Sequence, residues 1–375
     1  MPLPPETPGA RPRLQSIDLL RGGVMVLMTL DHTRGFFSNA PFSPVDLSRT
    51  FPALFLTRWL TYFCAPVFFL LAGTSAYLNG AGGKKTRGQL AQFLLTRGLW
   101  LVLLELTFLN WFAWTGVFSL HEFMAVVFWA LGWSMVALAA LLWLPIWAVG
   151  LFGLALCVGH NLLDGIGPGP WWWRILYAGG MVTLPGNIHL NVIYRLVPWL
   201  GLMAAGYACG PAFLAPRETR RRWAFCLGLT LVGLFIVVRA LNGYGDPAPW
   251  SPQKNAIFTV MSFVNCTKYP PSLDFLLMTL GPALLLLAYL EGETPALLEP
   301  WKVFGRTPLF FFLLHLPLIR VASTLSKSFR PEFYSGFGLL GVYIAWIIIV
   351  ALLYIPCRSF AALKRRHSSP WLSYL

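Results

Sequence analysis

The chain has 375 residues, of which 57% are hydrophobic and only 11% are charged, and its mean hydropathy is +0.64. This composition excludes an ordinary soluble domain, in which about a quarter of the residues are charged, and it indicates an integral membrane protein. The formal net charge is +14, from 28 Lys and Arg against 14 Asp and Glu. Because the basic residues gather in alternate loops and at the two ends, we expect a lipid bilayer and no nucleic acid as partner.

Apolar runs near the ~20 residues that a membrane span needs follow one another along the chain. They are continuous rather than alternating, so they predict an all-α polytopic bundle and not a β-barrel. We expect about ten transmembrane helices, at residues 17–38, 54–78, 90–113, 119–142, 144–163, 192–211, 222–242, 273–291, 305–326 and 335–359.

Both termini are predicted to be cytoplasmic, because the dense basic clusters then fall on one side of the membrane. These clusters lie at residues 11–13, 84–87, 217–222 and 358–366. The longer loops at 163–191 and 243–272 would then lie outside. Their many Gly, Pro, Trp and Asn residues suit a lid or a binding vestibule.

A single transmembrane domain is expected over residues 13–361. It is flanked by a Pro-rich tail at 1–12, expected to be disordered, and by a basic tail at 362–375, both cytoplasmic. No cleavable signal peptide is visible before the first apolar run, so the first helix is expected to remain in the protein.

The first predicted helix carries a stripe of residues at steps of three and four: Asp18, Arg21, Met25, Met28 and His32. Arg21 and His32 are roughly 16 Å apart along the axis at the usual helical rise. Charged groups inside a bilayer usually face the bundle interior and often mark a functional path. The stripe therefore predicts polar groups presented at two depths to one internal cavity, although Arg21 could instead pair with Asp18 or reach the inner boundary.

His32 lies directly after Asp31. An aspartate that accepts a hydrogen bond from one ring nitrogen leaves the other nitrogen free as a base, which is the arrangement of acyl-transfer enzymes. Neighbouring residues in a helix point about 100° apart, however, so Asp31 could orient another group.

Further polar residues stand in or near the predicted spans. His315 lies mid-helix and is either a satisfied core histidine or a partner of His32, while Arg306 near the inner end is either a snorkelling residue or a cation at the inner mouth. Glu105 is expected to be protonated or paired, with Arg97 or Arg58 as candidates. Polar residues near the outer face offer hydrogen bonds to a polar acceptor or are ordinary interfacial residues, and they include Arg58, His121, Glu122, Tyr194, Arg195, Lys268 and Tyr269.

The six cysteines are scattered without a C-x-x-C pair. They indicate neither a zinc site nor a disulfide framework, so no metal is expected.

Several blocks of the chain resemble one family in order. They read SIDLLRGGVMVLMTLDHTRGFF, RWLTYFCAPVFFLLAGTSAYL, RLVPWLGLMAAGYACGP, TKYPPSLDFLLMTLGPALLLLA and FGRTPLFFFLLHLPLI. Together, from about residue 13 to 360, they resemble the bacterial heparan-alpha-glucosaminide N-acetyltransferase catalytic-domain family. The first block also resembles the Arg-x10-His motif of acyltransferase type 3 membrane enzymes, here Arg21 and His32.

The resemblance implies a multi-pass acetyltransferase of the bacterial inner membrane. It would move an acetyl or other acyl group from cytoplasmic acyl-CoA, the co-substrate, to a hydroxyl or amine of an extracytoplasmic glycan. His32 would be the catalytic base or transient acyl carrier, with Arg21 in support. In the lysosomal acetyltransferases the catalytic histidine follows the first helix, but residues 33–60 contain no histidine here. The luminal amino-terminal extension of those enzymes is also missing here, so heparan is not carried over as the substrate.

The residues agree with this chemistry. The phosphates of CoA need cations at the inner mouth of the bundle. Candidates are Arg21, Lys84, Lys85, Arg87, Arg97 and Arg306. We predict His32, Asp31 and Arg21 as the catalytic group, and the expected substrate-binding residues are Arg58, His315, Lys268, Tyr269 and Arg306.

The main rival is a proton-coupled secondary transporter, with Asp31, His32, Glu105 and His315 as its proton relay. The chain has no internal symmetry of the kind that such transporters show. A non-catalytic assembly or lipid-flipping protein would leave the Arg21–His32 stripe without a purpose. A homo-oligomer remains open on sequence grounds.

Overall fold

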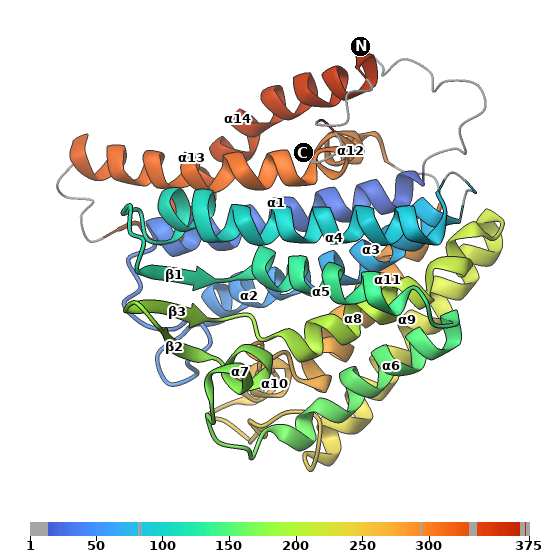
Figure 1. Ribbon diagram of the computed structural model, residues 1–375. Coiled ribbons are helices and arrows are strands. Elements are labelled where there is room, and N and C mark those ends of the chain that lie inside the picture. Colours follow the sequence, from blue (N-terminus) through green and yellow to red (C-terminus); the bar gives the residue numbers. More distant parts are fainter. Residues whose placement is uncertain are drawn as a thin grey trace.

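The computed structural model describes residues 14–81, 83, 85–292, 295–329, 336–367 and 372. The predicted amino-terminal tail at 1–12 and most of the predicted carboxyl-terminal tail beyond residue 367 lie outside this range. Long helices run side by side through the molecule, and a small sheet lies near one end (Figure 1).

In the described part of the chain, a helix occupies each of the predicted apolar runs. The helices are α1 (Gln15–Phe37), α2 (Pro52–Leu60) continued through a 3-10 turn into α3 (Cys64–Gly80), α4 (Arg87–Leu104) with a π-helical extension (Glu105–Trp114), α5 (Val127–Leu141), α6 (Ile146–Gly159) with a 3-10 turn (His160–Leu163), α8 (Leu196–Ala208) with a 3-10 turn (Gly210–Leu214), α9 (Arg217–Leu241), α11 (Leu273–Leu290), α12 (Glu299–Arg306), α13 (Pro308–Phe329) and α14 (Leu339–Arg366). The protein is an all-α polytopic membrane protein.

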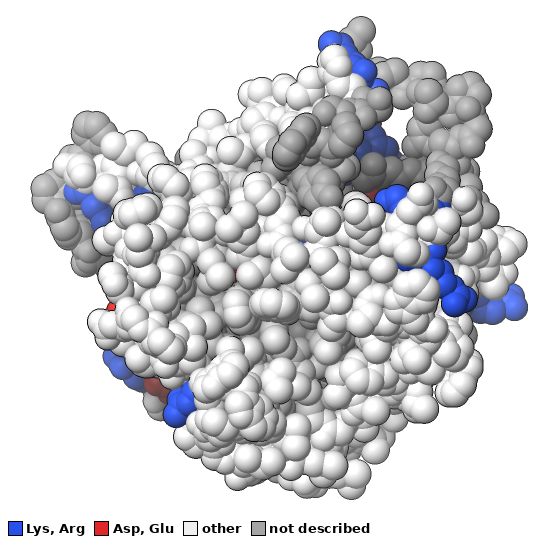
Figure 2. All heavy atoms as spheres, viewed as in Figure 1, with Lys and Arg blue, Asp and Glu red and all other residues white. Residues whose placement is uncertain are grey.

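Eight helical segments in the described residues are long and apolar enough to cross a membrane. The two other predicted spans are α1 and α5. Helix α1 has 23 residues but carries charges at both ends, and α5 has only 15 residues. In the view of Figure 2, the Lys and Arg side chains (blue) gather at the two ends of the molecule. The flank between these ends is almost entirely uncharged (white).

Some predicted boundaries were wrong. Residues 122–125, expected at the start of a helix, form a strand, and residue 192 ends another strand instead of opening a helix. The predicted helix at 305–326 spans two elements that meet at Thr307, and α14 runs to Arg366, so the first part of the predicted basic tail is helical.

The sheet has three strands in the order β1-β3-β2, with β1 (Glu122–Ala125) parallel to β3 (Ile188–Val192) and β2 (Gly180–Leu184) antiparallel to β3. A tight turn joins β2 to β3, where Gly186 and Asn187 have positive φ values of 81° and 58°. Gly and Asn adopt this conformation most readily, so the Pro-Gly-Asn sequence was the available signal for the hairpin. Two short helices lie in the loops that were predicted to be outside. Helix α7 (Trp171–Trp173) lies in loop 163–191, and α10 (Ala256–Val264) lies in loop 243–272.

Helix α1 lies at the centre of the bundle and contacts α12, α14, α13, α3 and α11. Its approach to α12 depends on glycine. A Cβ atom on Gly22 would lie 1.9 Å from the carbonyl oxygen of Trp301, and one on Gly305 would lie 1.8 Å from that of Asp18. Small residues let membrane helices pack backbone against backbone, and here they hold the polar stripe of α1 inside the protein.

Candidate active site

His32 lies near the carboxyl-terminal end of α1, which the predicted orientation makes the outer end, and it is paired with the second intramembrane histidine. Its Nδ1 atom lies 2.7 Å from Nε2 of His315 on α13, and the two rings stack with their centroids 5.0 Å apart. His315 is completely buried, whereas His32 is partly exposed. The sequence left a joint site and a core histidine as alternatives for His315, and the structure brings both imidazoles into one site.

Aromatic rings enclose the histidine pair. Trp114, at the end of the π-helical extension, meets the ring of His32 edge to face at 5.8 Å, and Phe312 does so at 6.3 Å. Phe312 also packs against His315 at 4.9 Å. Trp114 and Phe312 were missed by the sequence analysis, because aromatic residues are common throughout this chain.

Asp31 binds arginines and not His32. It accepts hydrogen bonds from Nη2 of Arg34 at 3.0 Å and from Nη1 of Arg58 on α2. The sequence left two roles open for Asp31, to orient His32 or to orient another group. The observed contacts agree with the second role. Arg58 was a predicted site residue, and Arg34 was missed.

The outer wall of this site comes from the segment that follows α10. Lys268 is 9% exposed, and its ammonium group faces the rings of Tyr62 at 5.7 Å and Tyr269 at 5.3 Å. Arg58 lies over the same Tyr62 ring at 5.1 Å, so one phenol contacts two cations. The ammonium group of Lys268 makes no ion pair or hydrogen bond within the described residues.

Tyr269 packs against Tyr194, with ring centroids 5.3 Å apart. Burial and the neighbouring phenol of Tyr269 raise the pKa of Tyr194 well above its ordinary value, so Tyr194 stays neutral. Burial would also raise the pKa of Tyr269, but the charges of Lys268 and Arg58 outweigh it and lower that pKa.

A buried arginine holds the segment that carries Lys268 and Tyr269. Arg239, near the end of α9, is 2% exposed and donates to the carbonyl oxygens of Phe263, Ala248, Ser262 and Asn265 at 2.9–3.3 Å.

Arg239 also lies 3.9 Å from Asp246 and 3.6 Å from Asp274. Asp246 in turn accepts from the backbone and side chain of Thr267 and from Ser272. A lone arginine in an apolar run was the signal for this clamp in the sequence.

Glu105 binds neither of the arginines proposed for it from the sequence. Its carboxylate accepts from Trp114 Nε1 at 2.5 Å and from the backbone N–H groups of Phe128 and Trp129 at 2.6 and 3.3 Å. These two N–H groups belong to the first turn of α5, where helices leave donors unpaired and favour negative charge. Glu105 thus fixes both Trp114 and the start of α5.

A cavity of about 350 Å³ lies toward the amino-terminal end of α1, which the predicted orientation makes the inner end. Its polar lining includes Arg21, Ser75, Asn79 and Arg97, and its remaining wall is mostly apolar. Arg21 donates to Ser75 Oγ at 3.1 Å and to the carbonyl oxygen of Gly305 at 3.2 Å, and it lies 3.7 Å from Asp18.

Some of the other cations predicted at the inner mouth are not part of this cavity wall. Arg306 lies 3.5 Å from Asp18 and is not part of the wall. Lys85 stacks over Phe93, a wall residue, at 3.9 Å. Lys84 lies outside the described residues.

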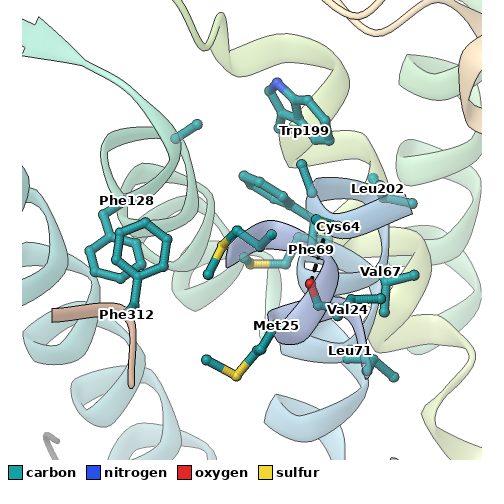
Figure 3. Packing of buried hydrophobic residues seen from close by; sticks show 14 of the residues in the cluster. Val24, Met25, Cys64, Val67, Phe69, Leu71, Phe128, Trp199, Leu202 and Phe312 are labelled. Atoms are coloured by element: carbon teal, nitrogen blue, oxygen red, sulfur yellow. Dashed lines mark hydrogen bonds between the residues drawn. The ribbon is translucent and has the colours of Figure 1, made fainter. Parts of the chain in front are cut away.

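The expectation of one cavity bordered by both Arg21 and His32 was wrong. The cavity reaches Phe128 and Phe312, whose rings face each other at 4.2 Å, but its lining does not include His32. Figure 3 shows these two rings close together, apart from the cluster in which Cys64 donates to the carbonyl of Val24. Phe312 lines the cavity and also packs against both histidines, so it forms part of the partition between them.

A family model described as heparan-alpha-glucosaminide N-acetyltransferase, catalytic, matches residues 13–239, which is more than half of the chain. The chain belongs to this family. Membership makes it a membrane acetyltransferase in general terms and fits its multi-pass fold. A search of curated proteins gave no match.

The family match includes only part of the site. Arg21, Asp31, His32 and Arg58 fall within it. The remaining predicted site residues come after its end, and these are Lys268, Tyr269, Arg306 and His315. In the structure, Lys268, Tyr269 and His315 lie beside matched residues at the outer end of α1. Arg306 pairs with Asp18, a matched residue at the inner end.

Proposed function

We propose that the protein transfers an acetyl group from cytoplasmic acetyl-CoA to a hydroxyl or amine of a glycan on the outer side of the bacterial inner membrane. Both termini would then lie in the cytoplasm. The observation that supports the proposal is the division of α1: Arg21, near its amino-terminal end, borders a cavity, and the partly exposed His32 lies near its carboxyl-terminal end.

The inner cavity suits the donor. CoA is a polyanion, and arginines bind phosphate strongly because charge-assisted hydrogen bonds gain strength away from water. Arg21 and Arg97 place guanidinium groups on the wall, and Ser75 and Asn79 offer neutral polar groups beside them. The apolar remainder of the wall would accept the thin pantetheine arm and the acetyl group.

The outer site suits a polar acceptor. Arg58, Lys268 and Tyr269 lie around Asp31 and His32, and His32 is partly exposed there. Sugars are recognised by hydrogen bonds to their hydroxyl and amine groups, which these side chains can supply. The glycan is therefore assigned to this end and the nucleotide to the other.

His32 would act as the base. As the acceptor oxygen or nitrogen forms a bond to the thioester carbonyl carbon, its proton passes to the imidazole. The tetrahedral intermediate then collapses with cleavage of the carbon–sulfur bond, and the imidazolium returns the proton to the leaving thiolate. In the alternative route, His32 attacks the thioester first and carries the acetyl group to the acceptor.

The contacts favour a transferase over a proton-relay transporter. A relay needs its carboxylates to face the imidazoles, but Glu105 bonds to Trp114 and to the start of α5, and Asp31 bonds to Arg34 and Arg58. Neither carboxylate hydrogen-bonds a histidine in the described residues.

The test uses the full chain reconstituted in lipid vesicles, with acetyl-CoA labelled in its acetyl group supplied on one side and glucosamine-containing oligosaccharides on the other. We expect labelled product only when acetyl-CoA is on the side of the termini. His32→Ala should lower kcat by about 10²–10⁴-fold, the usual contribution of a general base.

The matched control is His121→Ala, because His121 is an exposed histidine outside the site. It should retain full activity. Full activity of folded His32→Ala, or transfer with donor and acceptor on the same outer side, would overturn the assignment. Trapping of acetylated His32 in a rapid quench would select the two-step route.

A further inference from the structure

The geometry points to His315 as the positioning residue that fixes the tautomer of His32 and makes its Nε2 atom the base. This inference rests on the proposed function for its kinetic consequences, but the tautomer itself can be measured independently.

The first step concerns His315 Nδ1. This atom lies 2.8 Å from the carbonyl oxygen of Phe312 and 3.3 Å from that of Phe311. A carbonyl oxygen only accepts hydrogen bonds, so Nδ1 of His315 carries a proton. His315 is fully buried among apolar residues and has no carboxylate partner in the described residues, which favours the neutral ring.

The second step follows from the first. A neutral imidazole protonated at Nδ1 has its lone pair on Nε2, so His315 Nε2 accepts a hydrogen bond from its neighbour. That neighbour is Nδ1 of His32, 2.7 Å away, which must then carry the proton. Neutral His32 is left with its lone pair on Nε2.

The Nε2 atom of His32 is free to react. It makes no hydrogen bond to another described residue, and residue His32 is partly exposed. His32 therefore carries an unprotonated ring nitrogen that no described residue occupies. A ring free to populate both tautomers would present this lone pair only part of the time.

His315 thus takes the orienting role that an aspartate plays in a Ser-His-Asp triad. Asp31 cannot take it, because Arg34 and Arg58 occupy its carboxylate. Packing holds the orienter in place, since His315 stacks on Phe311 at 5.4 Å and meets Phe312 at 4.9 Å.

The charges around His32 come from several elements. Asp31 and Arg34 lie on α1, Arg58 on α2 and Lys268 on the segment after α10, while α13 contributes only the neutral His315. A substitution of His315 by a neutral residue leaves all these charges unchanged. The shape of the rate–pH profile then reports on the hydrogen bond itself.

The test compares His315→Leu with His315→Gln in the full chain in lipid. Leucine removes the acceptor, whereas the amide oxygen of glutamine can still accept from His32 Nδ1. We expect His315→Leu to lower kcat by up to about 10⁴-fold, the loss seen when the orienting aspartate of a Ser-His-Asp triad is replaced. KM for acetyl-CoA should change less than about twofold, because the donor cavity does not include His315.

His315→Gln should recover at least about tenfold of the lost rate if it restores the hydrogen bond. A merely structural histidine would lose stability in both variants and show no such recovery. Equal loss in the two variants, with both folded, would overturn the inference.

A spectroscopic measurement separates this inference from the proposed function. The ring nitrogens of ¹⁵N-histidine-labelled protein in lipid are assigned by difference against His32→Asn. We expect an unprotonated Nε2 and a protonated Nδ1 for His32 in the unsubstituted chain, and mixed tautomers in His315→Leu. A His32 ring protonated at Nε2 would overturn the inference even in an active enzyme, and the expected spectrum would support it even if no acetyl transfer were found.

Discussion

The inner and outer ends of α1 present opposite surroundings for charge. At the inner end Arg21 lies on a cavity wall, with hydrogen bonds to Ser75 and to the Gly305 carbonyl. At the outer end His32 is enclosed by Trp114, Phe312 and His315. One helix therefore carries a cation on the wall of a 350 Å³ cavity and an imidazole in a site walled by aromatic rings.

If the proposed function holds, the partition lets donor and acceptor approach His32 from opposite ends without an open channel across the membrane. The Phe128–Phe312 partition separates a 350 Å³ cavity from the histidine pair. A continuous wet channel would leak ions and expose the thioester to water. A partition at this place admits only what displaces an aromatic ring.

The largest expected effect is that of Arg239→Met, and it is confined to the outer end of the molecule. Arg239→Met leaves Asp246 and Asp274 without their buried partner, which typically costs about 3–5 kcal/mol. We expect segment 243–272 to exchange its amide hydrogens much faster and acetyl transfer to be lost, while acetyl-CoA still binds the inner cavity.

Arg222→Met, on the exposed first turns of the same helix, is the control and should change neither property. Loss of acetyl-CoA binding in folded Arg239→Met would show that the two ends are not independent.

The next effect belongs to the inner end. Arg21→Ala removes charge-assisted hydrogen bonds of about 1.5–3 kcal/mol each, so KM for acetyl-CoA should rise about 10- to 100-fold. KM for the acceptor should stay within about twofold, because the acceptor approaches from the other side. Steady-state kinetics with each substrate varied in turn checks this division.

Arg221→Ala removes one positive charge from the exposed inner end of α9 and should have no such effect. If Arg21→Ala impaired the acceptor and spared acetyl-CoA, the two ends would have been assigned the wrong way round.

A smaller effect is expected at Lys268. Lys268→Met keeps the length of the side chain but removes the ammonium beside Tyr62 and Tyr269. We expect KM for the acceptor to rise about tenfold through loss of one hydrogen bond from a charged group. Lys254→Met is the matched control, since Lys254 is an exposed outer lysine. A rise in KM for acetyl-CoA in place of the acceptor would contradict the placement of Lys268.

Sequence patterns predicted the features that depend on residues close together in the chain. The apolar runs gave the helices, and the spacing of Arg21 and His32 placed them on one face of α1, because both features depend on neighbours along the chain. Strand β1 was missed because Glu122–Ala125 leads straight into the apolar run of α5 without a turn signal. Its partner β3 lies more than 60 residues further on, and periodicity does not report such pairings.

Side-chain partners were harder to predict than elements. Asp31 precedes His32 in sequence, yet its ion-pair partners are Arg34, one turn on, and Arg58, on another helix. The hydrogen bond from His32 to His315 joins residues 283 positions apart. The aromatic partition depends on α5 meeting α13, which no short stretch of sequence encodes.

The smallest predicted change in activity concerns the partition. Phe312→Ala removes the ring that touches both the cavity and the histidines, at a cost in stability of about 3–5 kcal/mol. We expect water to reach the thioester through the gap, so hydrolysis of acetyl-CoA without acceptor should rise several-fold while coupled transfer falls. The measurement is the ratio of free thiol released to acetylated product.

Phe310→Ala is the matched control for this comparison, because Phe310 lies on the same helix but stacks on Phe360 at 4.1 Å and is not part of the cavity wall. It should lose similar packing without changing the ratio of hydrolysis to transfer. An unchanged ratio in folded Phe312→Ala would mean that the two ends of α1 are kept apart by something other than this ring, and that the donor reaches His32 along a different path.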